Sequence, residues 1–153
     1  MDIRRRVVLS LITIFIFISS KGFAANKKID IIMDGQNYKV TEVPVIIDGQ
    51  SVYSDIPIFI HKDYTFVPIR FIAEHYGAEV IWDQKTKTAT VIQQDKEIKM
   101  TINSKDVYIN SNKMILDEEV IPKFVTFPNN DSRTMVPLRF ISEAFGYEVG
   151  WNS

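Results

Sequence analysis

Two short stretches of the chain carry side chains at helical spacing, and each follows a Val-Pro pair. Val67 and Val136 precede prolines, which favours extended backbone at those valines. Pro68 and Pro137 suit the first position of a helix, where no amide donor is needed. The positions on the predicted helical stripes are Ile69, Ile72, Ala73 and Tyr76, then Leu138, Ile141, Ser142 and Phe145. We therefore predict two helices of about nine residues, each half buried against a sheet because such short helices are marginal alone.

Each predicted helix ends at a glycine and is followed by alternating apolar and polar positions. Gly77 and Gly146 can supply the left-handed cap that ends many helices. After Gly77 the period becomes two, which places Val80 and Trp82 on one face of a strand. In the second stretch Val149 and Trp151 hold the matching positions. We expect these side chains to face the core.

Turn signals divide the rest of the chain into hairpins. The turns that lie between apolar runs are Asp34-Gly35, Asp48-Gly49 and Asn110-Ser111-Asn112. Residues 86–92 and 97–102 alternate Thr and other polar residues with apolar ones, and Gln94-Asp95-Lys96 forms the turn between them. The sequence thus predicts three hairpins around the helices and a fourth after Trp82.

The two helical stretches are copies of one unit. Residues 65–82 return as residues 134–151 with 11 of 18 positions identical, which makes chance a poor explanation. The shared residues to which we assign a structural role are Val67, Pro68, Arg70, Phe71, Ile72, Glu74, Gly77, Val80 and Trp82, with Val136, Pro137, Arg139, Phe140, Ile141, Glu143, Gly146, Val149 and Trp151. We predict an α+β fold in which twisted antiparallel β-sheets pack on short helices, built from two tandem copies of a strand-helix-strand unit.

The repeat also predicts the boundaries of the domain. We place the domain at residues 43–151, with unit one at 43–104, unit two at 105–151 and an N-terminal strand or hairpin segment at 25–42. Copy two carries about seven extra residues, which we place in a surface loop near residues 127–132. Its counterpart of the 86–102 hairpin is missing, so a sheet edge would be left open. We expect the chain to be part of a longer protein or to borrow strands from a partner.

The N-terminus has the pattern of a secretory signal peptide. Arg4, Arg5 and Arg6 precede an apolar run at residues 7–18, and Gly22-Phe23-Ala24 forms a cleavage site of small residues. We expect cleavage after Ala24 and no stable membrane insertion afterwards. An uncleaved anchor is the alternative, although the run is shorter than a bilayer span. The predicted location is outside the cell, secreted or associated with a bacterial cell wall.

Composition limits the partners and the source of stability. Removing residues 1–24 takes away four basic residues and one acidic one, which leaves a net charge of about −4 and makes nucleic acid an unfavourable partner. The chain contains no cysteine, so the fold must rest on its apolar core.

The residues that could carry chemistry are few. Arg70 with Glu74, and Arg139 with Glu143, are four apart and favour an ion pair along each helix over a catalytic dyad. His61 and His75 favour ordinary solvated or packed histidines over a metal site. The acidic turn at residues 117–119 lacks the converging oxygens of a hard-cation site. We find no nucleophile elbow, phosphate loop or zinc helix, and we predict neither a cofactor nor enzymatic activity.

The order of motifs resembles a known family. A turn IIDGQSV precedes VPIRFIAEHYGAEVIWD, a strand pair TATVIQQDKEIKMTI follows, and a second turn YINSNK precedes VPLRFISEAFGYEVGW. From about Val43 to Trp151 this pattern is similar to the copper amine oxidase N-terminal-like domain, also called a stalk domain. The resemblance implies an antiparallel sheet twisted around a helix in an exported bacterial protein, and a non-catalytic accessory role. It brings no copper site, because an amine oxidase centre needs three histidine ligands and the chain has two histidines.

Two functions stay open at this level. The first is a structural module that holds or spaces a fused or associated extracellular domain. The second is a module that binds wall glycan or protein through rings in strands and loops, where aromatics can stack on sugars. The candidate rings are Tyr38, Tyr53, Tyr64, Tyr108 and Phe127. The alternative, which we favour, is that these rings complete the core. A copper-dependent oxidase component is a remote third option.

Overall fold

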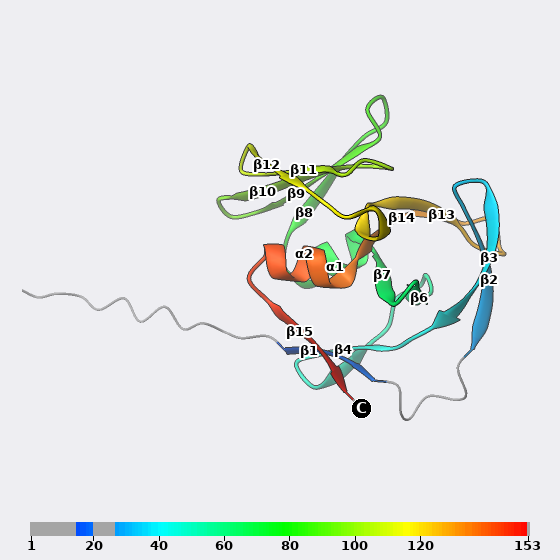
Figure 1. Cartoon of the computed structure of the whole chain (residues 1–153). Coiled ribbons are helices and arrows are strands. Elements are labelled where there is room, and N and C mark those ends of the chain that lie inside the picture. Colours follow the sequence, from blue (N-terminus) through cyan, green and yellow to red (C-terminus); the bar gives the residue numbers. More distant parts are fainter. Residues whose placement is uncertain (1–14, 20–26, 153) are drawn as a thin grey trace, which may run out of the picture.

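The computed structural model describes residues 15–19 and 27–152, and the side chains of 27–150. Within that part the fold is mostly β-sheet with two short α-helices. Figure 1 shows the helices at the centre, with one sheet above, a second below and a barrel to the right. The predicted signal peptide lies outside the described residues, except for Phe15–Ser19.

Six strands close into a barrel of antiparallel pairs. Its order is β13-β14-β7-β6-β3-β2, and β2 pairs with β13 to complete the ring. The strands are β2 (Lys28–Met33), β3 (Gln36–Glu42), β6 (Phe59–His61), β7 (Tyr64–Pro68), β13 (Lys123–Thr126) and β14 (Ser132–Pro137). A separate apolar cluster that includes Phe59, Phe66 and Met135 is buried among them. The segment 25–42, which we treated apart from the domain, supplies β2 and β3 to this barrel.

A five-stranded antiparallel sheet covers one side of the helices. Its order is β12-β11-β10-β9-β8. The strands are β8 (Glu79–Asp83), β9 (Thr88–Gln93), β10 (Lys96–Thr101), β11 (Asp106–Ile109) and β12 (Asn112–Ile115), and the 3₁₀ helix η1 (Glu118–Val120) follows. The predicted hairpin after Trp82 is confirmed, with a two-residue turn at Gln94-Asp95. Val80 and Trp82 pack against the core as expected, although both stay partly exposed.

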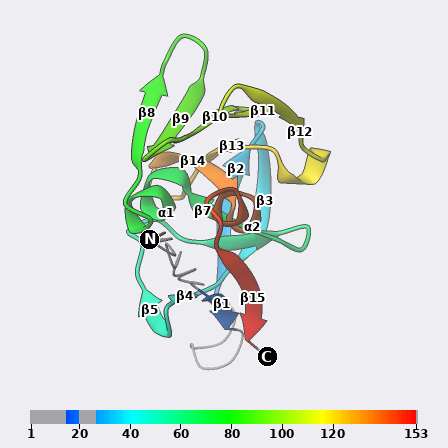
Figure 2. The same cartoon turned by 90° about the vertical axis from the view of Figure 1, so that its left-hand side faces the viewer.

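A smaller sheet lies on the other side of the helices (Figure 2). Its order is β15-β1-β4-β5, formed by β1 (Phe15–Ser19), β4 (Val45–Ile47), β5 (Gln50–Val52) and β15 (Glu148–Asn152). Its pair β1–β15 is parallel, which departs from the all-antiparallel sheets that we predicted. We predicted an open sheet edge in copy two. In the structure β1 pairs there, and β1 belongs to the predicted signal peptide.

Helices α1 (Ile69–His75) and α2 (Leu138–Ala144) each have seven residues, so our estimate of nine was too long. Pro68 and Pro137 are not the first helical residues. They are the N-caps, with extended backbone at φ −60°, ψ 127° and φ −63°, ψ 124°, and each is the last residue of a strand. The strand continues one residue further than predicted because β7 and β14 pair through these residues.

The two helices meet in the main core. The hydroxyls of Tyr76 and Ser142 lie 2.7 Å apart in a buried hydrogen bond. The Tyr76 ring stacks on Tyr147 with centroids 4.0 Å apart. The ammonium of Lys96 on β10 donates to the Ala144 carbonyl at 2.7 Å, at the end of α2. Gly77 and Gly146 have φ of 69° and 85°, which confirms the left-handed caps.

Candidate functional site

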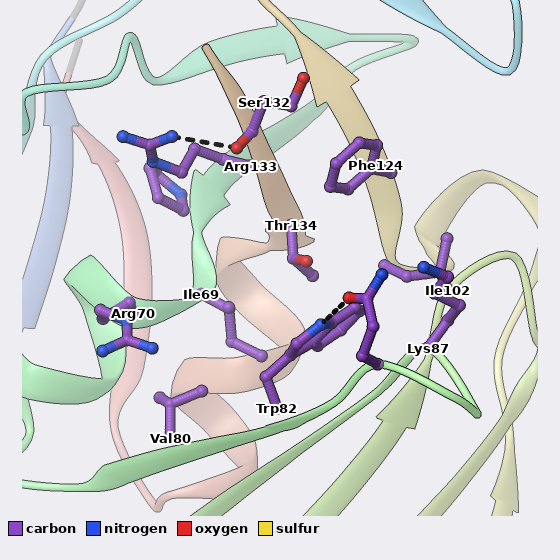
Figure 3. A pocket seen from close by; sticks show the side chains of 12 residues that line it. Ile69, Arg70, Val80, Trp82, Lys87, Ile102, Phe124, Ser132, Arg133 and Thr134 are labelled. Carbon is purple, nitrogen blue, oxygen red and sulfur yellow. Dashed lines mark hydrogen bonds between the residues drawn. The ribbon is translucent and has the colours of Figure 1, made fainter.

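A groove of about 420 Å³ lies where the five-stranded sheet meets the barrel. Its walls come from the β7–α1 junction, from β8 and the turn after it, and from β13 and β14 (Figure 3). The residues that line it are Pro68, Ile69, Arg70, Val80, Trp82, Gln84, Lys87, Ile102, Phe124, Ser132, Arg133 and Thr134. The groove therefore depends on segments that are far apart in the sequence.

Two aromatic side chains from different strands face this groove. Trp82 on β8 is partly buried, and its Nε1 donates to Oε1 of Gln84 at 2.8 Å, which fixes the indole (Figure 3). Phe124 on β13 is 49% exposed. Val80, which is partly buried, and Ile69, which is buried, complete the apolar part of the lining. Such a surface suits the flat, apolar face of a sugar ring or an aliphatic side chain.

Three cationic side chains surround the apolar surface. Arg133 donates from Nη1 to the Ser132 carbonyl at 3.0 Å, and its guanidinium lies 3.9 Å from carboxylate oxygens of Asp55 and Asp131. Arg70 and Lys87 are exposed and make no ion pair within the described residues. Since the whole chain has a net charge of −1, the groove is a local concentration of positive charge.

The lining residues offer contacts rather than acid-base chemistry. Ser132 and Thr134 contribute hydroxyls, but none of the twelve lining residues has a carboxylate or an imidazole side chain. The hydroxyl of Ser132 lies 2.8 Å from that of Thr126, so it is paired with another hydroxyl and not with a base. The groove as built can hold an anionic or amphipathic ligand.

The residues that the two copies share lie mostly in packing positions. Val67, Val136, Ile72 and Ile141 are fully buried in the main core, and Val149 is nearly so. Phe71 and Phe140 pack against that core from partly exposed positions. Five residues of the first copy line the groove, and four of them, Pro68, Arg70, Val80 and Trp82, are residues that the two copies share. The side chain of Trp151 lies outside the described residues, so its inward orientation stays a prediction.

The ion pairs predicted along the helices are present in one copy. Arg139 Nη1 lies 3.4 Å from Glu143 Oε1, and both side chains are exposed. The corresponding pair of Arg70 and Glu74 does not form in the described structure. Arg70 instead borders the groove, which leaves its guanidinium available to a ligand.

The two histidines lie on different elements and have ordinary packing partners. His61 on β6 contacts the Tyr38 ring edge-on at 4.8 Å, and burial, helped by Lys62 and Lys123, lowers the pKa of its imidazole. His75 on α1 lies 6.1 Å from the Phe71 ring. Among residues 15–19 and 27–152, no cluster of three or more His, Asp or Glu could hold a metal ion. The residues present do not fit an amine oxidase copper centre, which needs three histidines.

The acidic turn at residues 117–119 is partnered by lysine. Glu118 Oε2 lies 2.7 Å from Lys105 Nζ, and this hydrogen bond with its charge attraction lowers the pKa of Glu118. The same contact raises the pKa of Lys105. The turn therefore holds an ammonium group at the protein surface.

The aromatic residues that we predicted for ligand binding do not gather in one place. Phe127 is only 3% exposed and packs in the barrel core, as the favoured alternative predicted, so this candidate ring is not on a binding surface. The reason is that the 127–131 loop folds back, with the Phe127 amide donating to the Asp131 carbonyl. Tyr38 packs on the barrel, whereas Tyr53, Tyr64 and Tyr108 are exposed but do not line the groove.

A protein family matches most of the chain. Residues 45–153 match the family described as "Copper amine oxidase N-terminal domain". The chain belongs to this family. The match confirms the resemblance seen in the sequence and is consistent with a non-catalytic accessory module. Comparison with curated proteins gave no match. Within the described residues, no helix is both long and apolar enough to cross a membrane.

Proposed function

We propose that this chain is an exported, non-catalytic accessory module that holds or spaces a partner domain at the bacterial cell surface. The observation that carries the proposal is that repeated residues are buried in the core. Ile72 and Ile141 are fully buried in the core between the sheets. This burial supports a packing role for shared residues of both copies and not a pair of reactive sites.

The arrangement of layers supports a spacing role. Both helices lie between two sheets, and the barrel adds a second apolar core beside the first (Figures 1 and 2). Each core is close-packed and resists compression, and the paired strands β7 and β14 contribute side chains to both cores. A rigid body of this kind can keep a neighbouring domain at a fixed distance from a surface.

Activity assays on the purified chain test the non-catalytic role. We expect no hydrogen peroxide from a primary amine and no loss of turbidity from a peptidoglycan suspension, with the heat-denatured chain as control. Turnover of either substrate above that control would overturn the proposal.

A second candidate function is binding of an anionic wall polymer, and the groove favours it. Trp82 and Phe124 offer faces for sugar rings, while Arg70 and Lys87 are cations free of ion pairs within the described residues. A polymer with phosphate or carboxylate groups beside sugar rings matches both features. Neutral glycan would use the rings alone.

Sedimentation of the chain with isolated wall material tests this candidate. Phe124→Thr removes a ring that lines the groove, and Tyr108→Thr removes a ring of similar exposure, 40%, outside it. A ring contact of about 1 kcal/mol predicts about fivefold weaker binding for Phe124→Thr and unchanged binding for Tyr108→Thr. Equal loss in both variants, or no sedimentation of the parent chain, would exclude the groove as the binding site.

A further inference from the structure

Strand β1 occupies a defined place between two strands of the smaller sheet. It runs parallel to β15 and antiparallel to β4 (Figure 2). Position 16 pairs with Val149 on one side and with Ile47 on the other, and both of these side chains are buried. Position 16 is therefore in register with a buried residue of each neighbouring strand.

The five-stranded sheet contains a matching place. The Asp48-Gly49 turn aligns with Asn110-Ser111, which sets Ile47 against Ile109 and thereby β4 against β11. Ile109 pairs with Ile98 of β10 in the same way that Ile47 pairs with position 16. β10 is antiparallel to β11, as β1 is to β4. Strand β1 therefore has the partner, the direction and the register of β10.

The sequence of β10 shows what this place requires. Ile98 and Met100 are fully buried, while Lys99 between them is exposed. On β4, Val45 and Ile47 are buried next to the corresponding positions. A strand that fits here carries apolar residues at alternate positions and polar residues between them. Position 17, which corresponds to Lys99, is a phenylalanine in the present occupant.

The two sheets differ in what lies beyond this strand. In the larger sheet β9 separates β10 from β8, which follows α1. In the smaller sheet β15, which follows α2, pairs with β1 directly and in parallel. The smaller sheet thus holds a single strand where the larger one holds a hairpin. Its occupant is joined to the rest of the domain by residues 20–26, which include the predicted cleavage site after Ala24.

We propose that the edge of β4 is a strand-acceptor site, held by Phe15–Ser19 in the full chain and filled after leader removal by a β-strand of a partner protein. The partner is a polypeptide with an extended segment of the β10 type, apolar at alternate residues. The proposal rests on the proposed export, because cleavage is what frees the site. An empty site would expose the unpaired backbone of β4 and the side chains of Val45 and Ile47, so it favours a replacement strand.

Engineered disulfides in the full chain test the register. The chain has no cysteine, so any crosslink is specific. Paired residues on antiparallel strands have Cα atoms about 4.5–5.5 Å apart, within disulfide range. Ile16→Cys with Ile47→Cys should therefore crosslink under mild oxidation, whereas Phe17→Cys with Ile47→Cys should not, since position 17 is on the other face. Equal crosslinking in both variants would refute the register.

A labelled peptide of residues 88–101, which contains the β10 pattern, tests acceptance. We expect it to bind the reduced Ile16→Cys, Ile47→Cys chain and to lose at least tenfold in affinity when the disulfide locks β1 in place. A peptide with Ile98→Asp and Met100→Asp is the control and should bind to neither form. The reduced and locked forms differ by one bond, so both can be checked for folding by circular dichroism.

Three results would overturn the proposal. One is equal peptide binding to the locked and reduced forms, and another is absence of binding to the reduced form. The third is a dimer of the reduced chain that excludes the peptide, which would assign the site to a second copy of this chain. None of them bears on amine or peptidoglycan turnover, so the accessory role is tested separately.

Discussion

The hydrogen bond between Tyr76 and Ser142 joins the two helices and gives the sharpest test of the core. The two hydroxyl oxygens lie 2.7 Å apart, and the residues are 5% and 0% exposed. Water therefore cannot replace either partner when the other is removed. Burial raises the pKa of Tyr76 well above its ordinary value, against the opposing effect of this hydrogen bond.

Removing either hydroxyl leaves the other one buried without its hydrogen-bond partner. Tyr76→Phe leaves the Ser142 hydroxyl buried without this partner, and Ser142→Ala does the same to the phenol. A buried hydroxyl left unsatisfied costs about 1–3 kcal/mol, so each variant should lose about 2 kcal/mol in its free energy of unfolding. The double variant leaves neither hydroxyl unsatisfied, so it should lose only about 1 kcal/mol, the net contribution of the hydrogen bond, instead of about 4 kcal/mol. The coupling energy between the two sites is then about 3 kcal/mol.

Urea unfolding followed by far-ultraviolet circular dichroism measures these free energies. The m-values should stay equal across the four proteins, because the surface exposed on unfolding does not change. Tyr64→Phe is the control, since this exposed tyrosine should change stability by less than about 0.5 kcal/mol. If the two single losses add within about 0.5 kcal/mol in the double variant, the hydrogen bond does not contribute as described.

Three other predictions follow from single features. Gly77→Ala should cost about 1–2 kcal/mol, from backbone strain at φ 69° alone, because a methyl group there meets no atom within 4 Å; a loss in urea unfolding above about 3 kcal/mol would point to a clash instead. Because the pKa of Tyr76 is raised in the folded state, stability should fall as pH rises above the unfolded value of about 10. Between pH 8 and 11 the urea midpoint of unfolding should fall less in Tyr76→Phe than in the parent chain. Identical pH profiles of the two proteins would show that Tyr76 is not the cause. Arg139→Gln should change stability by less than about 0.5 kcal/mol, since its ion pair with Glu143 is exposed, and thermal unfolding at low and high salt checks it.

Local structure was predictable where the cause is local. The Asp34-Gly35 turn lies between β2 and β3 because both residues adopt positive φ, which these residue types tolerate. The glycines that end α1 and α2 were found for the same reason. The helix starts were wrong by one residue, because pairing between β7 and β14 holds Pro68 and Pro137 in strands. Pairing between strands that are distant in sequence thus outweighed the local preference of proline for the first helical position.

The barrel and the groove were not predictable from local pattern. Val125 on β13 pairs with Met33 on β2, although the two residues are far apart in sequence. No short-range signal in the sequence indicates which hairpins pair with each other to form the barrel. The groove combines Trp82 with Phe124, and the sequence predicted Trp82 only as a packing residue. Phe124 alternates outward on β13 while Val125 is buried, so the alternation alone could have placed that ring outside the barrel.

Closure of the barrel has a consequence for how the protein folds. The Lys123 ammonium meets the Asp34 carboxylate at 2.6 Å, although the two residues are 89 apart in sequence. Contacts of this kind slow folding, because a long loop must be ordered before they form. A chain that emerges N-terminal end first presents β2 and β3 long before β13 and β14 exist to cover them. The barrel should therefore close late, and until then the edge of β2 that pairs with β13 stays unpaired and open to aggregation.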